Sequence, residues 1–205
     1  MKRNQQETTQ QLESLTDFSL SLGASLAAVI PSAQILVEER LAQFCVEPRC
    51  PTYGLSPSCP PYVSGPAGFR KLQESHPYAI VIRLDVLAGV LFGDDRPVVM
   101  QVMHEIVSEV EHEAARFGFA NPQAFAGGSC KLVFCADEVN CAKLTTGECR
   151  HPDVARPSLS GFGVNVAKMM DACGWETKMG PPDPDAGNGT LSWVVGVVLV
   201  GSGGI

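Results

Sequence analysis

The residues of this chain best suited to chemistry are its eight cysteines, and four of them share one polar, loop-like stretch. These are Cys130, Cys135, Cys141 and Cys149. Four thiolates form a complete ligand set, because tetrahedral zinc binds four directly and an iron–sulfur cube binds one at each iron. Zinc sites usually contain CxxC pairs, and the sequence has none, so the spacing favours a [4Fe-4S] cluster over zinc. The polar neighbours disfavour the alternative, ordinary buried thiols.

A second group of cysteines, Cys45, Cys50 and Cys59, lies in a proline-rich loop. Prolines fix φ, so this loop can be rigid without regular hydrogen bonding. Three thiols leave one ligand position open for water, a substrate or another protein donor such as Cys173, and open positions are where metal sites do chemistry. We therefore predict a second metal site here, the alternative being a stiff loop with incidental cysteines.

The motifs around these cysteines are specific. Cys45 and Cys50 are followed by PTYG and by SCPP at residues 58–61, and later come AGGSC at 126–130 and CRHPDVARPS at 149–158. In these motifs the chain resembles a family of predicted metal-binding proteins, a domain of unknown function, over most of its length. The resemblance implies iron–sulfur or other metal binding through the cysteines and no established reaction. The cysteine spacing after GGSC is wider than in many relatives, so the resemblance does not extend to the cluster type.

Three basic residues adjoin Cys149 and are candidates for tuning a cluster: Arg150, His151 and Arg156. A thiolate-ligated centre is anionic, and N–H groups directed at its sulfurs raise its reduction potential. Helix capping or plain surface exposure is the alternative for all three. Four cysteines already complete the ligand set, so we do not include His151 among the ligands.

The remaining histidines and the last cysteine give weaker signals. His104 and His112 lack the i, i+4 spacing of a shared metal site, and we expect them to be solvated, like His76 beside Pro77. Cys173 ends an apolar helical pattern and is predicted to be a buried free thiol. No phosphate-binding loop, dinucleotide fingerprint or GxSxG elbow is present, so we expect neither nucleotide binding nor a serine nucleophile.

Hydrophobic periodicity predicts a layered α/β or α+β domain, with helices packed on a mixed sheet and two cysteine-rich metal loops at element ends. The expected helices are those near Leu12–Gly23, Phe69–Ser75, Val99–Phe117 and Ser158–Cys173. The expected strands are Ser25–Glu39 with an interruption at Pro31, Tyr78–Leu87, Gln123–Val133, Trp175–Met179 and Leu191–Val200. Residues 181–189 are expected to form a loop.

Length and composition limit the function classes. The 205 residues suit a single metal-binding domain, residues 1–205, with residues 1–10 expected to fray. A net charge of −7 without a basic face argues against nucleic-acid binding. Acidic residues near the start argue against a signal peptide, and no apolar run is long enough to span a membrane. We therefore expect a cytoplasmic location, where reduced cysteines serve as metal ligands or catalytic groups.

These observations together predict an iron–sulfur protein that acts in electron transfer or as a redox accessory, with a redox partner protein. It would carry one [4Fe-4S] cluster, or two if the three-cysteine site holds another. An enzymatic version, an oxidoreductase component, would use the open position of that site. The alternative from a different class is a zinc-stabilised protein-interaction module without redox activity.

Overall fold

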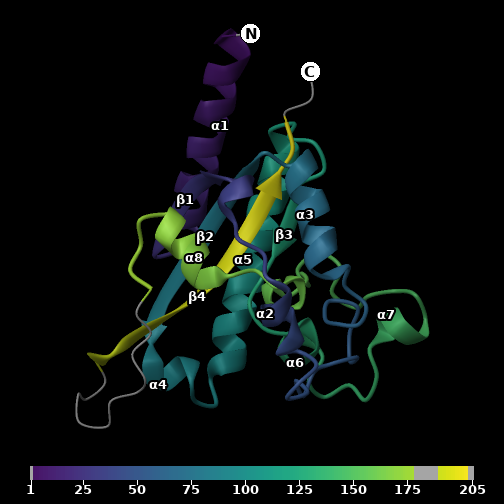
Figure 1. Cartoon of the computed structure of the whole chain (residues 1–205). Coiled ribbons are helices and arrows are strands. Elements are labelled where there is room, and N and C mark those ends of the chain that lie inside the picture. The colour runs from purple at the N-terminus through teal and green to yellow at the C-terminus, as the bar shows by residue number, and fades with distance from the viewer. Residues whose placement is uncertain (1, 178–188, 203–205) are drawn as a thin grey trace.

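The computed structural model describes residues 2–177 and 189–202, and an antiparallel sheet of four strands forms its centre (Figure 1). The strands are β1 (Leu26–Pro31), β2 (Tyr78–Leu87), β3 (Gln123–Phe125) and β4 (Leu191–Val200). They lie in the order β1-β2-β4-β3, and every neighbouring pair is antiparallel. Parallel pairing in the described part of the chain is limited to an isolated bridge between Ala126 and Ser158.

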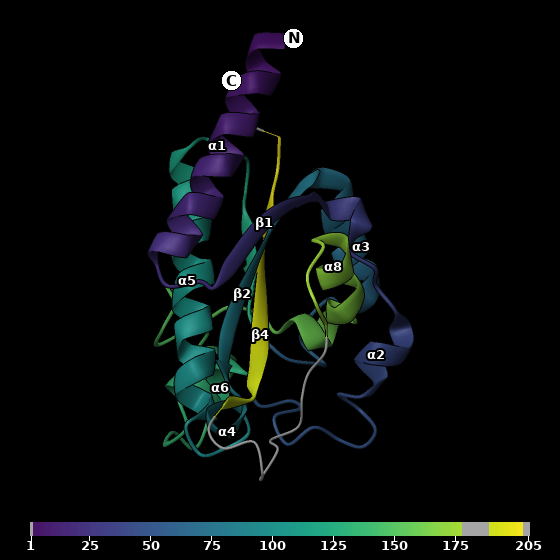
Figure 2. The ribbon, with the colours of Figure 1, turned by 90° about the vertical axis from the view of Figure 1, so that its left-hand side faces the viewer.

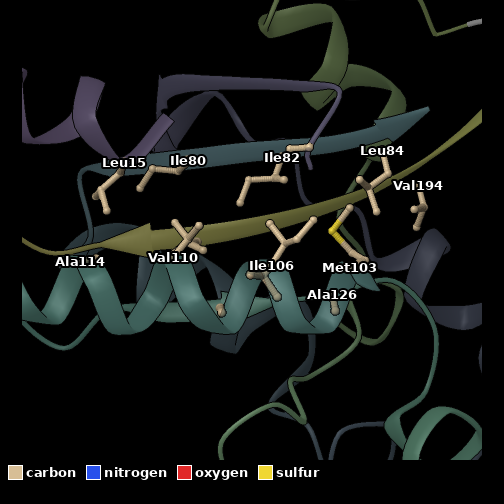
Figure 3. Packing of buried hydrophobic residues seen from close by; sticks show 14 of the residues in the cluster. Leu15, Ile80, Ile82, Leu84, Met103, Ile106, Val110, Ala114, Ala126 and Val194 are labelled. Atoms are coloured by element: carbon tan, nitrogen blue, oxygen red, sulfur yellow. The ribbon is translucent and has the colours of Figure 1, made fainter. Parts of the chain in front are cut away.

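Two long helices cover one face of the sheet, α1 (Lys2–Ser21) and α5 (Arg96–Arg116), as Figure 2 shows. A short helix, α4 (Ala88–Leu91), joins this layer after β2. Met103, Ile106 and Val110 of α5 point toward the sheet (Figure 3) and are buried there. This spacing of three and four residues is the apolar stripe of an amphipathic helix, and it anchors α5 along β4.

The opposite face of the sheet is covered by shorter elements. They are the 3-10 turns η1 (Ser32–Gln34) and η2 (Leu159–Phe162) and the helices α2 (Glu39–Gln43), α3 (Gly65–Ser75) and α8 (Val166–Ala172). Phe69, Phe125 and Phe162 form an aromatic cluster in this layer, with ring centroids 5.1–5.9 Å apart. The cluster ties α3, β3 and η2 together and so fixes the loops that follow them.

Several predicted elements are confirmed. The strands β2 and β4 have the predicted bounds, and α5 begins after Asp95 and ends near Gly118 as its stop signal indicates. Pro31 ends β1, which lies at the edge of the sheet, where a residue without an N–H is tolerated. The helical pattern around Leu12 and Leu15 is also confirmed, although Leu26 belongs to β1 and not to that helical face.

Four predicted elements are wrong in part. The strand expected over Ser25–Glu39 ends at Pro31, where the chain enters the turn η1. The strand expected over Gln123–Val133 ends at Phe125, because Gly128 adopts a positive φ of 77° and the chain then forms the helix α6 (Cys130–Phe134). The helix expected over Ser158–Cys173 is split between η2 and α8 at Gly163, where the φ of 69° interrupts helical geometry. Residues 175–177 are not in a strand. The rest of that strand, and all but the last residue of the loop expected over 181–189, lie outside the described residues.

Among the residues that the structure describes, no helix is both long enough and apolar enough to cross a membrane.

Candidate metal centre

Both cysteine regions lie at the same end of the molecule, near α2, α6 and α7 (Ala142–Thr145) in Figure 1. In the later region, α6 begins with Cys130, and the loop that follows carries the other three cysteines. The four line a single cavity of about 300 Å³: Cys130, Cys135, Cys141 and Cys149. Arg150 and His151 line the same cavity, so the structure brings two of the three predicted tuning residues to these thiols.

Lys131 also lines this cavity and is almost completely buried, with 7% of its surface exposed. Its Nζ donates to the carbonyl oxygens of Cys135 and Glu138, the latter at 2.7 Å. In the described part of the chain no carboxylate forms an ion pair with it. A buried cation without a counter-charge is costly, so this side chain favours an anion in the cavity.

The loop is closed by an ion pair. Arg150 Nη2 lies 3.2 Å from Glu138 Oε2, which joins the segment after Cys135 to the segment after Cys149. Burial raises the pKa of the Cys135 thiol, whereas the charges of Arg150 and Lys131 lower it in part. The two cations therefore offset part of the cost that burial imposes on the thiolate form, the form that binds metals.

The three earlier cysteines line a second cavity, of about 260 Å³, together with Arg96 and Gly128. Burial raises the pKa of the Cys45 thiol, and the neighbouring thiols of Cys50 and Cys59 raise it further. The three sulfur atoms are thus close enough to interact electrostatically. Cys173 does not line this cavity; it is a free thiol that packs against the core on the α3 side of the sheet, but it is partly buried and not fully buried as expected.

Two Ser-Cys pairs form the wall between the cavities. Ser58 and Cys130 line the four-cysteine cavity, while Cys59 and Ser129 line the three-cysteine cavity. The Cys59 thiol donates to Ser129 Oγ at 3.3 Å, and the Ser58 hydroxyl, hydrogen-bonded to Cys130, partly offsets the rise that burial causes in the pKa of that thiol. Each pair therefore supplies a thiol to one cavity and a hydroxyl to the other, and the two sites adjoin.

The thiols are not drawn together around a single point. Within residues 2–177 and 189–202, no group of three or more His, Cys, Asp or Glu side chains is arranged to hold a metal ion. The cysteines instead surround two cavities large enough for a multi-atom group. The donor set of four thiols with nearby cations suits an anionic thiolate-held centre.

Arg156 departs from its predicted role. It does not line either cysteine cavity; it is buried and pairs through Nε with Glu111 Oε2 at 2.7 Å. Its backbone N–H donates to Nδ1 of His104 at 3.1 Å. Arg156 therefore anchors the segment after Cys149 to α5 and acts on the site only through that segment.

Two histidines that we expected to be solvated are buried. His104 has no exposed surface because it lies under the segment that carries Arg156, and its ring meets the ring of Phe134 edge-on at 5.3 Å. Phe134 in turn stacks on His151 at 5.4 Å. His76 is 3% exposed, with its Nε2 2.8 Å from the carbonyl oxygen of Asn121. The expectation failed because loops distant in sequence cover both positions.

Sequence reasoning missed Lys131 and the two serines. The signal for the serines was visible, because both cysteine motifs contain the dipeptide Ser-Cys, at 58–59 and at 129–130. No signal marked Lys131, since its burial depends on how the loop after Cys135 folds back.

The fold and these cavities define a class: an α/β protein with a cysteine-lined site of two parts at one end of an antiparallel sheet. A family model described as predicted metal-binding protein (DUF2284) matches residues 28–200, so the chain belongs to that family, as its motifs indicate. Searches of curated proteins and of solved structures gave no match. The family description supports metal binding and leaves the metal and the reaction open.

Proposed function

We propose that this protein binds a [4Fe-4S] cluster through Cys130, Cys135, Cys141 and Cys149 and works in electron transfer or as a redox accessory. The observation that carries the proposal is the cavity that all four thiols line, with the buried, unpaired ammonium of Lys131 in its wall. A cluster held by four thiolates is an anion, and it would supply the counter-charge that the described residues do not provide.

The size of the cavity supports a cluster over a zinc ion. Zinc would require all four sulfurs at about 2.3 Å from one point. The described side chains have no such arrangement and instead surround about 300 Å³. An iron–sulfur cube places one thiolate at each iron and so needs ligands that are further apart.

When bound, such a cluster supplies a one-electron redox centre. The chain's own residues would set its potential and its access to solvent. Arg150 and Lys131 place positive charge beside Cys135, and positive charge and N–H donors favour the reduced, more negative state. The stacked rings of Phe134 and His151 lie at the same cavity and would cover part of a cluster bound there.

The three-cysteine cavity is proposed as a second metal site, held by Cys45, Cys50 and Cys59. Three thiols leave one position open, which is the arrangement of a site that binds a substrate. The observation that supports this second site is that the thiols of Cys50 and Cys59 raise the pKa of Cys45. In this form the protein would be an oxidoreductase component.

A redox partner protein is part of the proposal. Apolar side chains are exposed near the cysteines: Phe44, Val46, Leu55, Tyr62 and Val139. Exposed apolar groups around a redox site provide a contact surface for a partner. The eight cysteines are all free, which suits a reducing compartment, and we therefore propose a cytoplasmic location.

The first experiment is the iron, sulfide and zinc content per chain of protein purified without oxygen. Iron with matching sulfide, and a brown colour bleached by dithionite, are expected. Colourless protein with stoichiometric zinc would instead support the zinc-stabilised interaction module, and a folded protein without metal would contradict both functions.

The ligand assignment is tested by changing Cys135 and Cys141 to serine together. Iron content at the later site should then be lost, because two of four thiolates are removed. Cys173→Ser is the matched control, since Cys173 lines neither cysteine cavity, and it should retain the full metal content. Unchanged iron in the double variant would remove the four-thiolate site.

A further inference from the structure

A third cavity, of about 270 Å³, adjoins the three-cysteine cavity. The two share Arg96, Gly128 and Ser160 in their walls, so they meet at these residues. The remaining wall is mostly apolar and includes Phe92, Met100, Trp193 and Val195. A concave apolar site with few polar groups is the usual form of a small-molecule site.

The cavity exists because β3 is short. β3 pairs only with residues 197–199 of β4, so no strand within residues 2–177 and 189–202 lies beside the earlier half of β4 on that side. Gly127 and Gly128 pass closely there: a Cβ on Gly127 would lie 2.8 Å from Val194 Cγ2, and one on Gly128 would lie 3.2 Å from Met100 Cγ. The glycines thus allow the chain to form a wall of the cavity without filling it.

Two hydrogen-bond donors at this cavity are available to a ligand: the guanidinium of Arg96, an exposed residue, and the buried indole N–H of Trp193. Arg96 Nη1 donates to the carbonyl oxygen of Leu91 at 3.3 Å, but no described carboxylate pairs with its guanidinium. Trp193 Nε1 is buried and has no acceptor in the described structure. A buried N–H without a partner is unfavourable. A ligand with acceptor atoms and negative charge would satisfy both donors.

We propose that this cavity binds a small organic carboxylate with an apolar body, with the carboxylate on Arg96. The guanidinium fork matches a carboxylate with two hydrogen bonds. At the volume share of a liquid water, about 30 Å³, the cavity holds roughly nine non-hydrogen atoms, about the size of benzoate. Because Arg96 borders both cavities, the carboxylate lies beside the three-cysteine loop.

This placement names a substrate class for that loop. The binding of the anion stands on the cavity and on Arg96 alone, whereas its role as a substrate rests on the proposed function, in which the three-cysteine site keeps an open position. No other cation lines the third cavity, so Arg96 determines the preference for an anion.

The test is a titration of the full chain with benzoate, in which binding is detected both by the change in Trp193 fluorescence and by calorimetry. Benzoate should bind, and neutral benzamide, of nearly the same shape, should bind about tenfold more weakly or worse, since a charge-assisted pair is lost. Arg96→Gln should weaken benzoate binding by a similar factor. The matched control is Arg116→Gln, at the far end of the same helix and paired there with Glu113, and it should bind benzoate as the unchanged chain does.

The variant Trp193→Phe shows which residue gives the fluorescence change. It should abolish the change that benzoate causes, while calorimetry still detects binding. Equal binding of benzoate and benzamide, or an Arg96→Gln variant that binds benzoate normally, would overturn the proposal, as would no binding at all. Each titration is made on metal-loaded and chelated protein. If the chain binds benzoate but never holds iron, the proposed function is refuted and the benzoate site is supported. If the protein is brown but does not bind benzoate, the benzoate site is refuted and the proposed function is supported.

Discussion

His104 of α5 has no exposed surface, and its chemistry follows from that burial. His104 accepts the backbone N–H of Arg156 at Nδ1, so its neutral form carries the proton on Nε2, which has no well-formed hydrogen bond among the described residues. Burial, with the charge of Arg156 as a smaller cause, lowers the pKa of His104 to about 4; the backbone of Val154 raises the pKa and opposes the effect of burial only in part. The imidazole is thus held neutral at ordinary pH.

His104 makes the stability of the fold depend on pH. Its pKa is about 4 in the folded chain and about 6.5 in the unfolded chain, so the unfolded state binds more protons between these values. Its contribution is complete above about pH 6.5 and is lost as the pH falls to about 4. At about 1.4 kcal/mol per pH unit, the loss is about 3 kcal/mol. Urea unfolding between pH 7 and pH 4 measures it.

The variant that isolates this effect is His104→Asn, whose Oδ1 can still accept the Arg156 N–H. It should be less stable at pH 7 and should lose most of the steepness between pH 6.5 and pH 4. His112→Asn, on a more exposed part of the same helix, is the control and should keep the steep decline. If His104→Asn declines as steeply as the unchanged chain, another group carries the pH dependence.

At this scale the sequence predicted the candidate ligands but not their surroundings. Cysteine positions are visible as letters, and the structure places the two groups around two cavities, as their grouping suggests. Burial is not visible in this way. Helix periodicity and residue polarity alone predict that Lys131 and His104 are exposed. Both are buried because loops from elsewhere in the chain cover them.

Among the elements, β4 and α5 approach each other closely at a glycine in the core. A Cβ on Gly196 would lie 2.4 Å from Val107 Cγ1 and 2.6 Å from Met103 Sδ. Both neighbours are fully buried on α5, so neither can move into open space. A strand glycine here allows the helix to approach the sheet closely.

Replacing Gly196 by alanine should therefore destabilise the protein by about 1–3 kcal/mol through overpacking. The urea midpoint should fall with little change in the slope of the transition. Gly89→Ala in α4 is the control, because nothing lies within 4 Å of the added Cβ, and it should be neutral or slightly stabilising. Equal midpoints for the two variants would show that α5 yields to the extra methyl group.

The elements that sequence periodicity predicted best are those with the longest regular patterns. β2 and β4 are ten-residue segments rich in apolar and β-branched residues, and α5 has both a start and a stop signal. β3 could not be delimited in this way, since its pattern continues as far as Val133 while the backbone turns at Gly128. Before that turn Ala126 already bridges to Ser158 and no longer to β4, a contact between distant segments that the local pattern does not reveal.

Over the whole molecule, the hydrophobic cores and the cysteine regions are separate. The two buried clusters contain no side chain from residues 39–62 or 134–158. The sheet and its main helices therefore do not need the metal for their own packing. The conformation of the cysteine loops, by contrast, has little apolar burial to hold it and would gain most from bound metal.

Removal of the metal should accordingly loosen the loops and leave the cores folded. Far-UV circular dichroism should change little on chelation. Trypsin should cut at the exposed residues Arg49, Lys143 and Arg150 about tenfold faster or more, because local opening becomes easier. Complete unfolding on chelation would show instead that the metal sites support the entire fold, and unchanged cleavage would show that the loops are held without metal.

The two outer strands of the sheet also have a consequence for how molecules of this protein meet one another. One border is the six-residue β1, which terminates in a proline, and the other is the three-residue β3. Neither offers a long row of unpaired backbone groups on which a foreign strand could be templated. At high protein concentration, molecules should therefore not assemble into fibrils by pairing their edge strands. Concentrated solutions should remain clear as long as the cores stay folded.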